Sequence, residues 1–174
     1  DGYHTRLFFH RLGADPTTDV LVYSPPNPTD FPSASVSDDD RWVVVNNFRG
    51  WSQSDVHLLD RGRAARGRVA APDETHRLVP VIVGDDSLTS GRVHRSRLYL
   101  TTNRGASRYR IAAVDPARAD DVGQWRDVIP EGTSAIETWT IVGDRLAIHV
   151  LDDIRSRVML FALDGRPDGE IELP

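Results

Sequence analysis

Three residues with the side-chain types of a nucleophilic hydrolase triad stand close together, at Ser54, His57 and Asp60. The residues around them, SDVHLLD, have the composition of a β-strand. Side chains three positions apart along a strand point to opposite faces of the sheet, so the three groups cannot converge locally. We therefore predict a structural strand here and no catalytic residue in the chain.

Two carboxylate clusters have the donors for a divalent cation, Asp38 to Asp40 and the pair Asp152 and Asp153 beside His149. Aspartates at turns are far more often turn formers, because their side chains hydrogen-bond to the nearby backbone. His4 and His10 are too far apart on one strand to share a metal. The chain has no cysteine and hence no thiolate ligand or disulfide. We predict no metal site and no cofactor.

Composition excludes further classes of function. All 21 basic residues are arginine, so there is no Walker A lysine, Schiff-base lysine or Ser-x-x-Lys pair. No Gly-x-Ser-x-Gly nucleophile elbow occurs. The net charge of −5 argues against a general nucleic-acid-binding protein, whose footprint is a basic face.

Hydropathy and cysteine usage bear on location. No apolar run approaches the ~18 residues of a membrane span, and the opening DGYHTRLFFH lacks the pattern of a signal peptide. The absence of cysteine fits a reducing compartment. We expect a cytoplasmic protein with no membrane partner.

The elements that must position these side chains are strands. Short runs rich in Val, Leu, Ile, Tyr and Phe alternate with turn residues, and no window sustains a helical period for three turns. The predicted strands are residues 6–12, 19–24, 41–47, 54–60, 97–103, 108–115, 144–152 and 157–164. The segment PARADDVGQW, residues 116–125, is predicted to form one helical turn at most.

A phrase of two strands recurs along the chain. Its first strand begins with an arginine and an apolar run, at Arg41, Arg97 and Arg145. Its second strand closes on an aspartate, at Asp60, Asp115 and Asp164. A period near 50 residues with several short strands per unit is typical of a β-propeller blade, whereas a sandwich would not repeat the phrase.

We therefore predict an all-β fold, a partial β-propeller of about three to four blades, each an antiparallel four-stranded sheet. Closed propellers use about four to eight blades, so we expect residues 1–174 to be one partial domain made of central blades. An open arc leaves apolar blade faces uncovered, which favours self-association. Residues 6–12 and 157–163 are expected in that contact.

Four segments in order carry a resemblance to a known family. They are FFHRLGADPTTDVLVYS at 8–24, SVSDDDRWVVVNNFRG at 35–50, LTTNRGASRYRIAAVD at 100–115 and WRDVIPE at 125–131. Over nearly the whole chain they resemble the propeller domain of the prolyl oligopeptidases, which shows a Ser-x-Asp-Gly-Arg turn and a Thr-Asn-Arg-x-Ala-x-x-Tyr-Arg hairpin. One departure is Asp40 in place of the turn glycine, and aspartate tolerates left-handed geometry.

The resemblance implies a seven-bladed parent ring joined to an α/β-hydrolase domain with a Ser/His/Asp triad, which is absent from these residues. The chain would then be the non-catalytic propeller portion of a serine peptidase that cleaves short peptides after proline. It would restrict substrate access, line the peptide-binding cavity and be inactive alone. Its partners would be the hydrolase domain and short proline-containing peptides. The alternative is an independent β-rich interaction module that completes its ring by self-association.

The resemblance also points to substrate-contact residues, at Phe31, Phe48, Arg49 and Trp51. Phe31 takes the place of an apolar residue shortly before the Ser-x-Asp-Gly turn, and the others belong to the loop after the following strand. The family residue at Phe48 can be an arginine. Phe31 and Trp51 stand among Pro, Asp and Ser, so they either cover a partner or pack under their own loops.

The arginine-rich hairpin matches a structural motif of the family at Asn103, Arg104, Tyr109 and Arg110. Asn103 suits a turn, because its side chain bonds to the local backbone. Arg104, Arg108 and Arg110 can form bidentate pairs with carboxylates. We favour a structural role between blades over substrate contact, with Asp60 or Asp164 as the partner.

Overall fold

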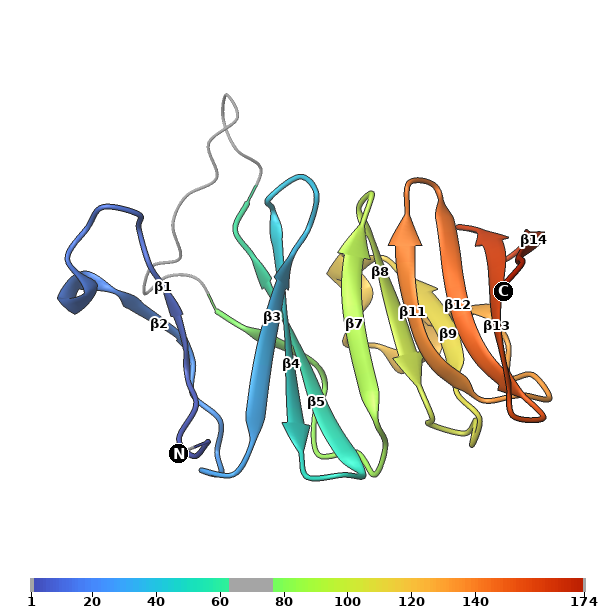
Figure 1. The fold of residues 1–174 in the computed structure, drawn as a ribbon. Helices are drawn as coiled ribbons and strands as arrows, with labels where there is room; N and C mark the ends of the chain where they lie inside the picture. Colours follow the sequence, from blue (N-terminus) through green and yellow to red (C-terminus); the bar gives the residue numbers. More distant parts are fainter. Residues whose placement is uncertain (1, 63–76, 174) are drawn as a thin grey trace.

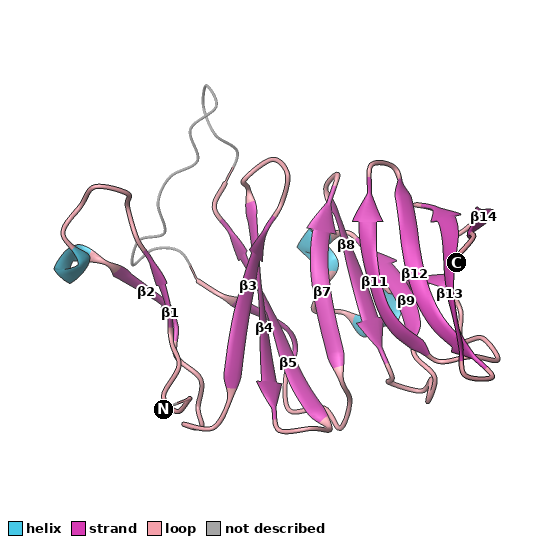
Figure 2. Ribbon diagram, in the orientation of Figure 1, coloured by secondary structure: helices cyan, strands magenta, loops and turns pink. Residues whose placement is uncertain are grey.

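The computed structural model describes residues 2–62 and 77–173. Three four-stranded antiparallel sheets and one two-stranded hairpin stand side by side (Figure 1). The described residues contain no α-helix, only the 3-10 turns η1 (Pro16–Thr18), η3 (Pro116–Arg118) and η4 (Val122–Gln124) (Figure 2). No helix in these ranges is long and apolar enough to cross a membrane.

The sheets follow the chain strand by strand. The hairpin consists of β1 (Leu7–Phe9) and β2 (Val20–Tyr23). The first blade consists of β3 (Phe31–Val36), β4 (Trp42–Arg49), β5 (Gln53–Asp60) and β6 (Val79–Ile82). The central blade consists of β7 (Thr89–His94), β8 (Arg97–Thr102), β9 (Arg110–Val114) and β10 (Arg126–Ile129). The C-terminal blade consists of β11 (Ile136–Val142), β12 (Arg145–Asp152), β13 (Arg155–Ala162) and β14 (Pro167–Ile171).

This arrangement confirms the predicted partial propeller. The recurring phrase corresponds to the second and third strands of each blade, and every predicted strand is present. The first and fourth strands of the three blades were not predicted. The prediction for residues 116–125 was wrong by one turn, because η3 and η4 form two separate turns, each capped by the preceding aspartate.

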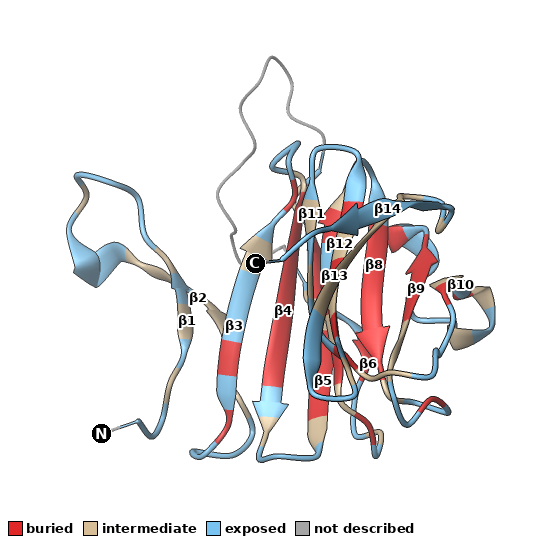
Figure 3. Ribbon diagram, turned by 45° about the vertical axis from the view of Figure 1, so that its right-hand side comes forward, coloured by how far each residue is buried: buried red, intermediate tan, exposed pale blue. Residues whose placement is uncertain are grey.

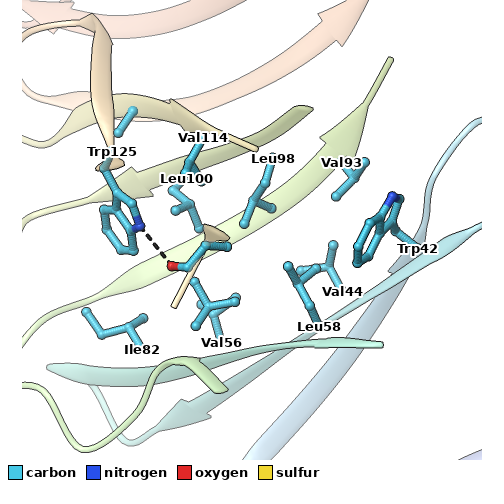
Figure 4. Close-up of a cluster of buried hydrophobic side chains, with 13 residues drawn as sticks. Trp42, Val44, Val56, Leu58, Ile82, Val93, Leu98, Leu100, Val114 and Trp125 are labelled. Carbon is cyan, nitrogen blue, oxygen red and sulfur yellow. Dashed lines mark hydrogen bonds between the residues drawn. The ribbon is translucent and has the colours of Figure 1, made fainter. Parts of the chain in front are cut away.

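Apolar side chains on alternate positions fill the three seams between neighbouring sheets. The seam under the β1–β2 hairpin contains Leu7, Val22, Val43, Val45 and Leu59. The seam between the first and central blades contains Val44, Val56, Leu58, Val93, Leu98 and Leu100, with the Trp125 indole N–H donating to the Ala119 carbonyl over 3.0 Å (Figure 4). The seam between the central and C-terminal blades contains Tyr99, Ile111, Ala113, Leu146, Ile148 and Val150.

The outer face of the C-terminal blade is not covered by any described residue. The middle strands β4, β8 and β9 are mostly buried, whereas β13 and β14 are half-buried or exposed (Figure 3). By register, Val158 and Leu160 of β13 lie on this outer face, opposite His149 and Ala147 of β12. The expected apolar end face is therefore present.

Each blade is a four-stranded meander, so its first strand begins and its fourth strand ends at the same end of the sheet. We call this the linker end; it lies at the bottom of Figure 1 and carries the β6–β7 and β10–β11 linkers, the β4–β5 turn and the β8–β9 loop. The opposite end, here the hairpin end, carries the β3–β4, β7–β8 and β11–β12 turns.

Candidate functional site

The linker end of the first blade presents three large aromatic side chains. Phe31 of β3 stands opposite Phe48 of β4 in the register, and Trp51 lies in the turn that follows. Phe31 is 55% exposed, Phe48 38% and Trp51 98%. Phe31 and Trp51 are therefore not buried under their own loops, which was the alternative that the sequence left open for these two residues. Large apolar side chains exposed at one end of a blade are typical of contact surfaces. We call Phe31, Phe48 and Trp51 the linker-end aromatic surface.

Arg49 is held in place instead of being free in solvent. Its Nη1 donates to a carboxylate oxygen of Asp55 over 3.4 Å, and Asp55 is buried. The same oxygen accepts the Gly84 backbone N–H at 2.8 Å, so one carboxylate ties the end of β4 to the β6–β7 linker. The Arg49 Nε is buried without a partner in the described structure. Asp55 was not singled out from the sequence, although it stands next to Ser54, which was.

The arginine-rich hairpin organises both linkers of the central blade. The Asn103 side-chain oxygen accepts the Leu88 N–H at 2.7 Å, and Arg104 donates to Asp85 over 3.2 Å. Leu88 and Asp85 belong to the β6–β7 linker. On the other side of the loop, Glu131 accepts the backbone N–H of Arg108 at 2.7 Å. The hairpin therefore fastens the central blade to the segments that enter and leave it.

The predicted partners of these arginines were wrong. Arg110 pairs with Asp127 of the adjacent strand β10, inside its own blade. Asp60 pairs with Arg41, and Asp164 pairs with Arg166. Tyr109 adopts a left-handed φ of 66° and packs at the edge of the third seam. The carboxylate partners of the hairpin are local, as Asp127 is, or lie in linkers, as Asp85 and Glu131 do, and the structural role between blades stays a prediction.

Ser54, His57 and Asp60 do not form a triad. Ser54 is fully buried and its hydroxyl bonds to the backbone of Thr89 across the second seam. His57 points to the opposite side of the sheet, where its ring centroid lies 5.2 Å from that of Tyr23. Asp60 lies at the hairpin end. Burial lowers the pKa of His57, and burial near Asp55 raises the pKa of Tyr23 to about 12.

The first aspartate cluster stabilises the β3–β4 turn. Asp39 accepts a hydrogen bond from the Ser37 hydroxyl at 2.6 Å, and this bond lowers the pKa of the carboxyl group. Asp40 has a φ of 58°, the left-handed geometry that the sequence indicated. Asp38 pairs with His94 at the hairpin end of the second seam.

Three other candidate ligands, Asp152, His149 and His10, have protein partners. Asp152 pairs with Arg157, and His149 lies 3.0 Å from the Ser156 hydroxyl. His10 pairs with Asp19. Across residues 2–62 and 77–173, no group of three or more His, Cys, Asp or Glu side chains is arranged to hold a metal ion. The linker-end aromatic surface is therefore the strongest candidate site found from the predicted residues.

Comparisons with known proteins agree with this fold. A sequence model of the family described as "Prolyl oligopeptidase, N-terminal beta-propeller domain" matches residues 1–174. "Prolyl oligopeptidase A" of Amanita bisporigera is 24% identical over 175 aligned positions, which cover 91% of this chain and 22% of that protein.

Solved structures show the same similarity. A structure from a study of two prolyl endopeptidases and their inter-domain dynamics matches with a TM-score of 0.84 and 28% identity, over 99% of this chain and 24% of that one. Prolyl oligopeptidase B from Galerina marginata, bound to a 35mer hydrolysis and macrocyclization substrate, shares the fold with a TM-score of 0.81 at 15% identity, over 97% of this chain and 23% of that one. The chain thus spans about a quarter of these relatives.

Proposed function

The chain belongs to the N-terminal β-propeller domain family of the prolyl oligopeptidases, and from that membership we propose that it is the non-catalytic propeller portion of a serine peptidase of this kind. In this proposal a separate α/β-hydrolase domain carries the catalytic triad and cleaves short peptides after proline. The propeller portion restricts access to that domain and contributes contacts to the peptide.

The linker-end aromatic surface is the observation that carries this proposal. Three aromatic rings stand exposed at one end of one blade, and Trp51 is almost wholly in solvent. Aromatic surfaces bind proline-rich segments well, because the pre-organised extended peptide loses little entropy and packs its rings on theirs. A neighbouring domain or a bound peptide would cover this apolar area.

Arg49 has a positioning role in this proposal. Its bond to buried Asp55 orients the β4–β5 turn that carries Trp51. Phe48 stands where the family can have an arginine, so this side chain offers apolar contact in place of a charged one.

Substitutions in the parent enzyme test the proposal. Trp51→Ala and Phe48→Ala, introduced into the full-length protein that contains this chain, should each lower kcat/KM for a proline-containing peptide by about five- to tenfold, or about 1 kcal/mol. Val36→Ala, which shortens an exposed apolar side chain at the hairpin end, is the matched control and should change nothing. Unchanged kcat/KM in both aromatic variants would contradict the proposal.

The chain by itself should be inactive. A purified sample should not cleave a chromogenic Gly-Pro substrate, because an activated nucleophile and an oxyanion hole come from the hydrolase domain. Turnover that is abolished by Ser54→Ala or His57→Ala would show that the serine, histidine and aspartate of β5 act catalytically after all.

A second candidate function is an interaction module that completes its ring by self-association. The uncovered outer face of the C-terminal blade favours it, since exposed apolar area is destabilising by about 25 cal/mol per Å². Residues 6–12 and 157–163 are the proposed contact.

Light scattering at micromolar concentration tests this candidate. The unmodified chain should associate, and Leu160→Arg on the outer face should make it monomeric. Ile154→Arg, at a fully exposed turn position, is the control and should still associate. A monomeric unmodified chain would exclude self-association through this face.

A further inference from the structure

The seam between the first and central blades is closed at its inner side by polar side chains. The Asn46 side chain of β4 makes two hydrogen bonds to the backbone of Gly91 on β7, over 2.7 and 3.2 Å. The Ser54 hydroxyl donates to the Thr89 carbonyl and accepts the Thr89 N–H, both over 2.6 Å. The free edge of β7 is thereby satisfied and cannot pair with another strand.

The seam between the central and C-terminal blades lacks this closure. Thr101 of β8 takes the position that Asn46 takes in the first blade: each stands between a serine of the first strand and an apolar residue of the third. The Thr101 side chain is shorter than that of Asn46. The residue is only 9% exposed, and its hydroxyl is buried without a hydrogen-bond partner. A buried unpartnered hydroxyl is unfavourable unless a ligand or water satisfies it.

A groove of about 590 Å³ opens on the inner strands at this place. Its walls include Phe48, Thr101 and the inner strands β3, β7 and β11, and Trp139 of β11 lies along it. A volume in this range suits a small ligand or a short peptide segment.

The groove also contains two opposite charges without protein partners. Arg92 of β7 and Glu137 of β11 both line it, and neither makes an ion pair or side-chain hydrogen bond to any described residue. Strand β11 pairs only with β12. The N–H of Ile136, its first residue, donates to the Arg108 carbonyl over 3.0 Å, but within the described chain no side chain bonds to the β11 backbone as Asn46 bonds to β7, so the edge beyond Ile136 is open. An open strand edge can accept an extended peptide by backbone pairing.

We propose that this groove binds an extended peptide segment that carries one carboxylate and one cationic group. Arg92 pairs with the carboxylate and Glu137 with the cation, while Thr101 satisfies a backbone group of the peptide. Phe48 and Trp139 pack against its apolar residues. The inference rests on the proposed peptide-contacting function and adds a second contact region, which shares Phe48 with the linker-end aromatic surface but does not include Phe31 or Trp51.

Fluorescence of Trp139 provides the test. The probe is a capped hexapeptide, acetyl-Glu-Gly-Pro-Phe-Gly-Arg-amide, titrated into the chain with Trp51→Phe as background, because the remaining tryptophans Trp42 and Trp125 are buried. The fluorescence should change saturably. Arg92→Ala should weaken binding of the probe about tenfold, because one charge-assisted pair is lost. An analogue in which Gln replaces the peptide Glu lacks that pair already, so Arg92→Ala should not weaken its binding further.

Further variants distinguish binding in the groove from binding at the linker-end aromatic surface. Glu137→Gln should weaken binding of the probe about tenfold. Thr101→Val should weaken binding a few-fold, but it should leave the unfolding midpoint of the chain unchanged or higher, because the substitution removes an unsatisfied hydroxyl. Arg97→Ala, an exposed arginine on β8 outside the groove, is the control. The proposal that the groove binds a peptide is contradicted if no saturable binding is seen, or if binding is unaffected by Arg92→Ala and Glu137→Gln. Binding lost only with Phe31→Ala overturns the groove and supports the linker-end surface instead.

Discussion

The third strands of the central and C-terminal blades are both apolar, but they differ in burial. In β9, residues Ile111 to Val114 are at most 4% exposed, whereas no residue of β13 is fully buried. The run Val-Met-Leu-Phe-Ala in β13 is no less apolar than Ile-Ala-Ala-Val in β9. The difference arises because the central blade has a neighbour on both faces and the C-terminal blade has one on a single face. The burial of a third strand in this fold therefore depends on whether its blade has a neighbour on both faces, and not on the apolar character of the strand itself.

A substitution at the seam that joins these two blades should cause the largest loss of folding stability. Gly165, in the turn between β13 and β14, has a φ of +91°, and a Cβ at this position would lie 1.9 Å from the Val128 carbonyl oxygen of β10. Gly165→Ala should lower the free energy of unfolding by about 3 to 5 kcal/mol, through backbone strain together with a clash against rigid backbone. Urea unfolding measures this loss.

Gly143→Ala is the matched control for this substitution. Gly143 also has a positive φ, +57°, but a Cβ there meets nothing within 4 Å. The loss should be about 1 kcal/mol, the strain of left-handed backbone alone. Equal losses in the two variants would mean that the contact between the turn and β10 does not form.

Truncations in the two third strands test the comparison directly. Ile111→Ala in β9 should lower the free energy of unfolding by about 3 kcal/mol, because it leaves a cavity between two blades. Leu160→Ala on the outer face of β13 should lower it by about 1 kcal/mol or less, since the side chain is only partly removed from water. Denaturant unfolding at low concentration is the measurement, and similar losses would indicate that a partner covers the outer face.

The seam under the β1–β2 hairpin extends the comparison to a blade face that is covered only by two strands. Burial there holds the pKa of His57 below its ordinary 6.5. The unfolded chain then binds more protons than the folded chain, so stability is full above about pH 6.5 and falls as the pH drops below it. His57→Phe, which keeps a ring beside Tyr23, should reduce this pH dependence between about pH 7 and 5. An unchanged slope in thermal unfolding would show that this seam is open to water.

The smallest contribution to stability is expected from an ion pair at the surface of the seam between the central and C-terminal blades. Arg95 of the β7–β8 turn pairs with Asp144 of the β11–β12 turn, and both side chains are 62% exposed. A double-mutant cycle with Arg95→Ala and Asp144→Ala should give a coupling energy below about 0.5 kcal/mol. A coupling above about 1 kcal/mol would mean that ion pairs at the hairpin end, and not apolar packing, hold the two blades together.

The strands that could be predicted from the sequence are those whose own residues are apolar enough. Some strands place apolar side chains in the seams on both faces of their blade, as Val43 to Val45 do in β4 and Leu98 to Leu100 do in β8. These continuous apolar runs predict strands without knowledge of the fold. The innermost strands read FPSASV and TSGRVH and contain mainly small and polar residues. Gly91 shows why: a Cβ there would lie 2.9 Å from a methyl carbon of Leu100.

The sequence by itself determined the repeat, the blade-like pattern and the aromatic residues of the linker end, because these follow from local composition and spacing. Only the tertiary structure decided that β7 is a strand held by Asn46 from 45 residues away, and that Arg104 and Arg110 pair with Asp85 and Asp127. It also placed Thr101, Arg92 and Glu137 in one groove. The physical reason is that hydrogen bonds and ion pairs have short range, so their partners depend on which segments meet in space.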